Sequence, residues 1–311
     1  MQARAIYALV KSAVSAWSAD FAQSMGAALS YYTLFSVAPL LVIVIAVAGA
    51  LFGQDAAHAA ILDQARALLG AEGARAIETM LASAQSKAQH GLIASLASVV
   101  ALLIGATSVF SELETDLNRI WGVESKRKPG LWSFIRGRVL SFGVILALAF
   151  LVLVSLALSA ALAAWGGFWS SWFGDLHFLL ECANFALSFI VIMLLFALIY
   201  KLMPKTHVRW RDVGIGSAVT AALFMVGKSL IGIYIGKSAI ASAYGAGGAL
   251  VALLVWVYYS AQIFLLGAEF THAYAQNQVR RADAGNRLGR ISTQGVLTRS
   301  VPHVDERIAG Q

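Results

Sequence analysis

The sequence predicts an all-α protein: a polytopic membrane helical bundle of six transmembrane helices with both termini in the cytoplasm. An amphipathic helical loop outside the cytoplasm joins the first two helices. Three observations predict this fold class. Hydrophobic residues make up 59% of the 311 positions and charged residues only 13%, with a mean hydropathy of +0.74, which lies outside the range of soluble domains. Six apolar stretches are each long enough to cross a hydrocarbon core of about 30 Å. Lysine and arginine gather in alternate connections.

The first 22 residues predict an amphipathic helix that lies in the headgroup region. Arg4, Lys11 and Asp20 are spaced among apolar residues at helical intervals. Residues 23–274 then form the predicted six-helix transmembrane domain.

The first span, residues 27–53, has an unusual polar half. Hydroxyl side chains, among them Tyr31, Tyr32 and Ser36, precede Pro39, where a helix loses a backbone hydrogen bond. One interpretation is an interfacial tyrosine belt followed by a tolerated proline. The other is a kinked helix whose polar side lines a cavity between helices.

The remaining elements follow in order. Residues 54–90 predict two amphipathic helices over the mouth of the bundle, or alternatively a solvated loop. The other predicted spans are 91–111, 139–164, 177–200, 213–236 and 248–271. Residues 275–311, basic and with little hydrophobic pattern, predict a disordered cytoplasmic tail.

Basic residues set the orientation and predict contacts with anionic headgroups. With a cytoplasmic N-terminus, eighteen Lys and Arg lie in inside segments and four in outside segments. This asymmetry explains the net charge of +7 without a nucleic-acid partner. The predicted headgroup contacts are Lys126, Arg127, Lys128, Arg136, Arg138, Lys205, Arg209 and Arg211.

Ionisable residues inside predicted spans are functional candidates, because their burial in a bilayer is costly unless they are paired or hydrated. Glu181 and Asn184 lie near the outer end of the fourth span, and Lys228 near that of the fifth. We expect either that Glu181 and Lys228 approach each other or that each extends to its interface.

The sixth span carries Gln262 and Glu269 on roughly one face, near the cytoplasmic interface. Basic residues such as Lys201 are candidates to neutralise Glu269, which favours a structural role over transport chemistry. The predicted substrate path joins these two residues to the first-span positions and to Glu181, Asn184 and Lys228.

Glycines mark two further features. Gly49 with Gly53, Gly214 with Gly216 and Gly232 with Gly236 have the spacing of close helix packing. Tyr244, Gly245, Gly247 and Gly248 form a cluster at the start of the sixth span, which predicts a hinge or a re-entrant bend.

Nothing in the sequence predicts catalysis, a cofactor or a metal site, so we expect no enzyme activity. The single cysteine, Cys182, excludes an intramolecular disulfide, the six histidines share no ligand spacing, and a Walker A sequence is absent. Glu112, Glu114 and Asp116 form the only acidic cluster, which we interpret as a solvated helical end and not as a nuclease site.

Several motifs in order resemble the YihY/BrkB membrane-protein family, historically also labelled ribonuclease BN. They are AALSYYTLFSVAPLL at 27–41, ELETDLNRIWGV with Asn118 and Trp121, LWSFIRGR at 131–138, LMPKTHVRWRDVGIGS at 202–217 and YGAGGALVALLVWVYYSAQIFLLGAE at 244–269. The resemblance covers about residues 20–275. It implies a six-helix inner-membrane protein linked to envelope integrity and, in pathogens, to serum resistance.

The resulting functional hypothesis is transport or translocation of a lipid or another anionic amphiphile in the bacterial inner membrane, without an ATPase in this chain. A non-enzymatic scaffold for envelope assembly is the alternative, and a ribonuclease is disfavoured. The expected partners are anionic membrane lipids, envelope proteins and a second copy of the chain, and no nucleic acid.

Overall fold

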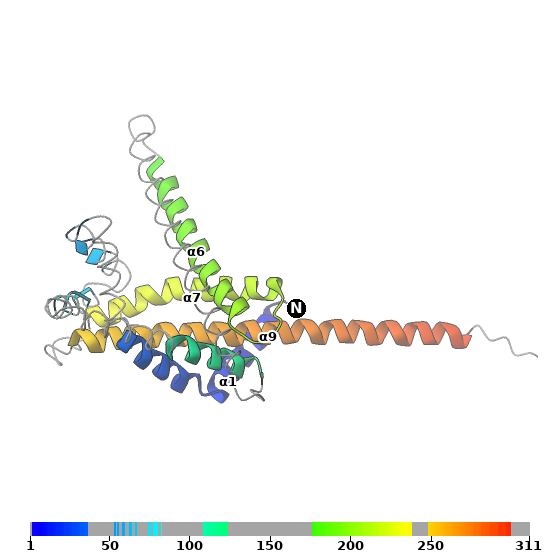
Figure 1. Cartoon of the computed structure of the whole chain (residues 1–311). Coiled ribbons are helices and arrows are strands. Elements are labelled where there is room, and N and C mark those ends of the chain that lie inside the picture. Colours follow the sequence, from blue (N-terminus) through cyan, green and yellow to red (C-terminus); the bar gives the residue numbers. More distant parts are fainter. Residues whose placement is uncertain are drawn as a thin grey trace, which may run out of the picture.

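The computed structural model describes residues 2–36, 108–123, 176–237 and 248–299, together with isolated positions between 53 and 82 (Figure 1). All regular structure within these ranges is α-helical. This agrees with the all-α prediction. The predicted third span lies outside the described residues, as do most of the second and the part of the first that follows Ser36.

Helix α1, Gln2–Ala19, lies where the amphipathic helix was predicted. Leu9 and Ala13 are buried on one face, and an apolar set remains exposed on another. That exposed set consists of Ile6, Tyr7, Val10 and Val14. The chain turns at Phe21, whose φ of 57° is left-handed, a conformation that costs a non-glycine residue about 1–2 kcal/mol. Residues 22–36 then form a second helix beside α9.

Three helices among the described residues are long and apolar enough to cross a membrane. They are α6, Leu176–Leu202; α7, Trp210–Lys237; and α9, Gly248–Arg299. Their positions coincide with the predicted fourth, fifth and sixth spans. Helix α7 packs against both α6 and α9, and α1 packs against α9 (Figure 1).

Helix α9 corrects the expectation of a disordered tail after residue 275. It has 52 residues, which at about 1.5 Å per residue is more than twice the thickness of a hydrocarbon core. Its last part projects beyond the other helices (Figure 1). Low hydrophobicity predicted disorder, but no proline interrupts residues 248–299, and a helix already nucleated by packing extends at little cost.

Helices α7 and α9 meet through a reciprocal glycine–threonine contact. A β-carbon at Gly216 would collide with Oγ1 of Thr271, and one at Gly267 would collide with Oγ1 of Thr220. Thr220 Oγ1 donates to the carbonyl of Gly216 at 2.8 Å, and Thr271 Oγ1 donates to that of Gly267 at 2.7 Å. Each helix therefore supplies both a glycine and the threonine that fills the facing gap. This close approach is typical of helix packing in membranes.

Tyr200 joins α6 to this contact. It is 1% exposed, and its hydroxyl donates to the carbonyl of Phe264 at 2.7 Å and lies 3.2 Å from Oγ1 of Thr220. The rings of Phe196 and Phe264 contact it at centroid distances of 6.2 and 5.2 Å. Phe224 extends the aromatic cluster, with its ring 5.7 Å from that of Phe196 and 6.4 Å from that of Trp256. The core therefore lies where α6, α7 and α9 come together.

We expect Gly267→Ala to destabilise the protein by about 1–3 kcal/mol, the cost typical of forcing an extra methyl group into a packed core. The new β-carbon would displace Thr220 and the hydroxyl of Tyr200. Thermal unfolding of the purified protein in neutral detergent measures the effect.

Gly214→Ala and Gly232→Ala are the matched controls, because a β-carbon at either glycine meets no atom of the described residues within 4 Å. Both should leave stability unchanged or raise it, since alanine favours a helix by up to about 1 kcal/mol over glycine. Equal loss of stability in all three variants would contradict the reciprocal contact.

Candidate functional site

Charged and titratable side chains from four segments gather at one end of the bundle. We call this end of the bundle the turn end. Its four segments are the α6–α7 turn at residues 203–209, helix 108–120 with Trp121, the Asp20–Phe21 turn, and residues 269–280 of α9. In the predicted orientation this is the cytoplasmic end. The three candidate spans have their boundaries here, at Leu202, Trp210 and Arg280.

Two lysines fix the α6–α7 turn. Lys205 pairs with Glu114 at 2.5 Å, and its backbone N–H donates to Oδ1 of Asn118 at 2.8 Å. Lys201 donates to the carbonyl of Val208, and its ammonium lies 5.4 Å from the ring centre of Trp210. Lys205, predicted as a headgroup contact, thus docks the turn onto helix 108–120. Arg209 and Arg211, predicted with it, are exposed.

Asp116 is buried, which corrects the interpretation of the acidic cluster as a solvated helical end. It is 3% exposed, and its Oδ2 has no hydrogen-bond partner within the described ranges. Burial raises the pKa of Asp116 to about 7; repulsion from Glu112 adds to the rise and attraction to Arg119 opposes it. Tertiary packing of helix 108–120 causes the burial, since its neighbours Leu117 and Ile120 belong to the core.

Glu269 is buried inside the candidate span of α9 with 1% exposure, and Oε1 has no hydrogen-bond partner among the residues described. The charged group that faces it is a second carboxyl group, that of Asp20. Lys201 was a candidate to neutralise Glu269, but its ammonium is bonded to Val208 instead. Two carboxyl groups therefore face each other where α1 ends against α9.

Gln262 lies two turns before Glu269, at the contact between α9 and helix 22–36. Its Nε2 donates to the carbonyl of Ala22 at 3.3 Å, and a β-carbon at Gly26 would collide with its amide. Its Oε1 is buried and, in the described part of the chain, has no hydrogen-bond partner. Gln262 and Glu269 thus both present an unpartnered acceptor oxygen inside a candidate span.

Three hydroxyl groups of helix 22–36 bond within their own helix. Ser30 donates to the carbonyl of Gly26 at 2.7 Å, Thr33 to that of Leu29 at 2.7 Å, and Ser36 to that of Thr33 at 3.0 Å. Tyr31 is 56% exposed and contacts Tyr32 and Phe35. A lining shared by Tyr31 and Gln262 stays a prediction.

The other predicted site residues divide into two groups. Lys228 is half-buried on α7, Asn184 is exposed on α6, and Gly248 is buried at the start of α9. The remaining predicted residues or their side chains lie outside the described residues, so the Glu181–Lys228 approach stays a prediction. They are Pro39, Glu181, Tyr244, Gly245, Gly247, Lys126, Arg127, Lys128, Arg136 and Arg138.

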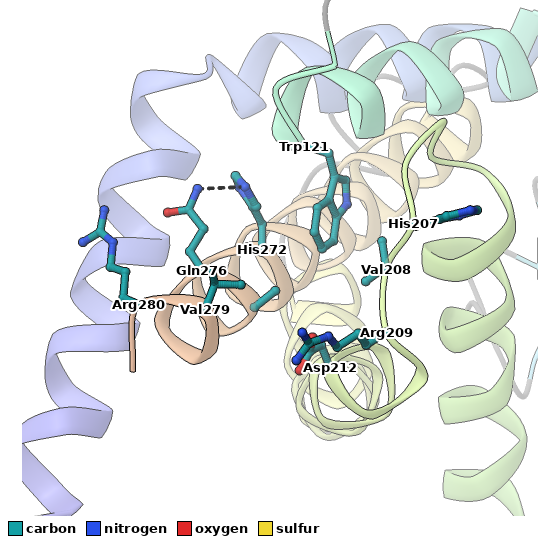
Figure 2. Close-up of a pocket in the computed structure, with 10 residues that line it drawn as sticks. Trp121, His207, Val208, Arg209, Asp212, His272, Gln276, Val279 and Arg280 are labelled. Carbon is teal, nitrogen blue, oxygen red and sulfur yellow. Dashed lines mark hydrogen bonds between the residues drawn. The ribbon is translucent and has the colours of Figure 1, made fainter. Parts of the chain in front are cut away.

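A pocket of about 420 Å³ opens at the turn end (Figure 2). Its cationic and imidazole side chains are Arg209, Arg280, His207 and His272, and its apolar wall includes Trp121. The rings of Trp121 and His272 lie 4.9 Å apart, and Nε2 of Gln276 lies 2.9 Å from Nε2 of His272.

The sequence analysis missed the pocket and three packing glycines, Gly26, Gly227 and Gly267. One signal was available: Gly26, Gly216 and Gly267 are each followed four residues later by a hydroxyl residue that bonds back to the glycine carbonyl. The pocket has no such local signal, because its lining comes from segments far apart in the sequence. Within the described ranges, no group of three His, Cys, Asp or Glu is placed to hold a metal ion.

Comparison with known proteins finds one protein family. Residues 13–291 match the family model described as Virulence factor BrkB. The chain is similar to the UPF0761 membrane protein of Verminephrobacter eiseniae, with 31% identity over 81% of this chain and 58% of that protein. It is also similar to the UPF0761 membrane protein of Alcanivorax borkumensis, with 28% identity over 90% of this chain and 65% of the relative.

A third relative, the UPF0761 membrane protein of Glaesserella parasuis, is 29% identical over 60% of this chain and 63% of its own length. The chain thus spans about three fifths of the length of these curated relatives. No solved structure matches it.

We expect the stability of the protein to fall as the pH rises from about 4 to about 7. In this window folded Asp116, with its raised pKa, holds a proton that the unfolded chain has released, so raising the pH favours unfolding. Above about pH 7 both states are deprotonated and the effect levels off. Thermal unfolding between pH 4.5 and 8 should show this slope reduced in Asp116→Asn, whose side chain does not titrate.

Glu112→Gln is the second variant. It removes a neighbouring charge that raises the pKa of Asp116, so the upper end of the slope should move to lower pH. An identical pH dependence in the parent protein and in Asp116→Asn would rule out the titration of Asp116.

Proposed function

This chain belongs to the BrkB family of membrane proteins, and from that premise we propose that it moves a lipid or another anionic amphiphile through the membrane. It does so without an ATPase of its own. The observation that carries the proposal is a pair of acceptor oxygens on α9, those of Gln262 and Glu269, which have no hydrogen-bond partner among the described residues.

These two residues differ from the other buried polar groups of the bundle. Thr220 and Thr271 are buried but donate to carbonyls of their own helices, and Tyr200 donates to α9. Such groups stabilise packing, and each of these three hydroxyl groups has a hydrogen-bond partner. Within the described part of the chain, one carboxyl oxygen of Glu269 and the amide oxygen of Gln262 lack donors inside a candidate span, and this energetic cost favours a functional role.

The chemistry of the two ends supports an amphiphile as the substrate. Free acceptor oxygens inside the span bind the hydroxyl or amino groups of a headgroup. Exposed arginines at the turn end, Arg209 and Arg280, attract its anionic group. The exposed apolar face of α1 provides a surface that adsorbs to the membrane beside them.

We expect Glu269→Leu, which removes both acceptor oxygens, to slow lipid movement about tenfold, the effect typical of losing one buried hydrogen bond. The assay reconstitutes the full chain in phosphatidylglycerol-containing vesicles and follows a fluorescent phosphatidylglycerol by quenching from outside. Gln262→Leu should also slow the movement.

Thr271→Val is the matched control, because Thr271 is buried two positions away and its hydroxyl is bonded within its own helix. It should leave the rate unchanged. Parent protein that moves no lipid would refute transport, and capture of a stoichiometric envelope protein in that case would favour the scaffold alternative. Rates that fall only in proportion to lost folded protein would make Glu269 a structural residue.

A further inference from the structure

We propose that the turn-end pocket is a binding site for a phosphate ester, that of an anionic lipid headgroup. The inference rests on the proposed function and names the chemical class of its substrate. Four features of the pocket carry it: its charges, its apolar wall, its position along the spans and its origin in separate segments.

Cations from two different elements line the pocket. Arg209 directly precedes α7 and Arg280 lies on α9, and both side chains are exposed and line the same hollow (Figure 2). Asp212 is the acidic residue in the wall, 5% exposed, so the cations exceed the anions. Arginine presents several N–H donors in a plane that matches phosphate oxygens.

Neutral polar groups add donors around the same space. His207, His272 and Gln276 line it as well. The indole Nε1 of Trp121 is buried and, among the described residues, has no hydrogen-bond partner.

The rest of the wall is apolar, which favours an ester with an organic part over a free inorganic ion. Trp121, Val208, Ala275 and Val279 form this part of the lining. The volume of about 420 Å³ lies within the range of small-molecule sites and accommodates a headgroup with its glycerol. Helix α1, with its exposed apolar face, packs against α9.

The position of the pocket matches the depth of a lipid phosphate. Five of its lining residues lie in the last part of the candidate span Leu250–Arg280, Asp212 lies in the first turn of the span Trp210–Ile235, and residues 207–209 directly precede that span. Apolar helix therefore gives way to polar chain at the level of the pocket, as hydrocarbon gives way to headgroups in a bilayer. A phosphate here could bind while its acyl chains remain in the membrane.

Titration calorimetry tests the proposal on the purified full chain in neutral detergent. The principal ligand is dihexanoyl phosphatidylglycerol. Arg209→Gln and Arg280→Gln should each weaken its binding about tenfold or more, as expected for the loss of a charge-assisted hydrogen bond. Ala275→Trp should weaken it similarly by filling the pocket without changing any charge.

Arg211→Gln is the matched control, because Arg211 is exposed, lies two positions from Arg209 and does not line the pocket. The affinity of Arg211→Gln for dihexanoyl phosphatidylglycerol should stay within about twofold of that of the parent protein. Equal weakening by Arg209→Gln, Arg280→Gln and Arg211→Gln would overturn the site in favour of diffuse attraction. Binding left intact in Ala275→Trp would overturn it too.

Two further ligands separate the chemical classes. Glycerol 3-phosphate should bind more weakly than the lipid. Equal affinity would mean that the pocket binds a phosphate ester but that the ester need not belong to a lipid, which would overturn the lipid headgroup as the ligand. Octanoate should not compete with phosphatidylglycerol, and full competition would overturn the preference for phosphate.

The two proposals fail separately. Binding that depends on Arg209 and Arg280 in a protein that moves no lipid would keep the pocket and refute transport. Lipid movement unchanged in both arginine variants, with phosphatidylglycerol binding lost, would keep transport and remove the pocket from its path.

Discussion

The reciprocal contact between α7 and α9 is the constraint on which the rest of the described structure depends. Gly216 faces Thr271 and Gly267 faces Thr220, so each helix carries one gap and one side chain to fill it. In a bilayer no hydrophobic effect drives apolar helices together, and close packing of small residues replaces it. The threonines also bond within their own helices, and the contact therefore leaves no hydroxyl unsatisfied.

This contact fixes the rotation of α9 and with it the faces that α9 presents to other elements. With Thr271 and Gly267 against α7, Gln262 meets Ala22 on helix 22–36 and Glu269 meets Asp20 beside it. One helix thus has a fully bonded face and a face with unpartnered oxygens. The difference separates polar groups that stabilise packing from those we assign to function.

The basic residues of the turn end likewise divide into some that stabilise the fold and some that we assign to function. Lys201 and Lys205 are bonded to Val208 and Glu114 and hold the α6–α7 turn in place. Arg209 and Arg280 line the pocket instead. This division fits the chemistry of the two residue types, because arginine binds phosphate through several N–H donors at once, whereas the lysine ammonium is a compact point charge.

The sequence by itself determined the helical class, the positions of α6, α7 and α9, and the shared face of Gln262 and Glu269, because hydropathy and helical periodicity are local properties. It did not determine the extent of α9, whose packed part nucleates a polar extension. It identified only one of the packing glycines, Gly216, whereas a β-carbon at Gly214 or Gly232 would meet no atom of the described residues within 4 Å. Only the tertiary structure decided those contacts, the burial of Asp116 and the pocket at the turn end. Each depends on which faces of distant helices meet, and that choice is made by packing between segments, which spacing along one segment does not encode.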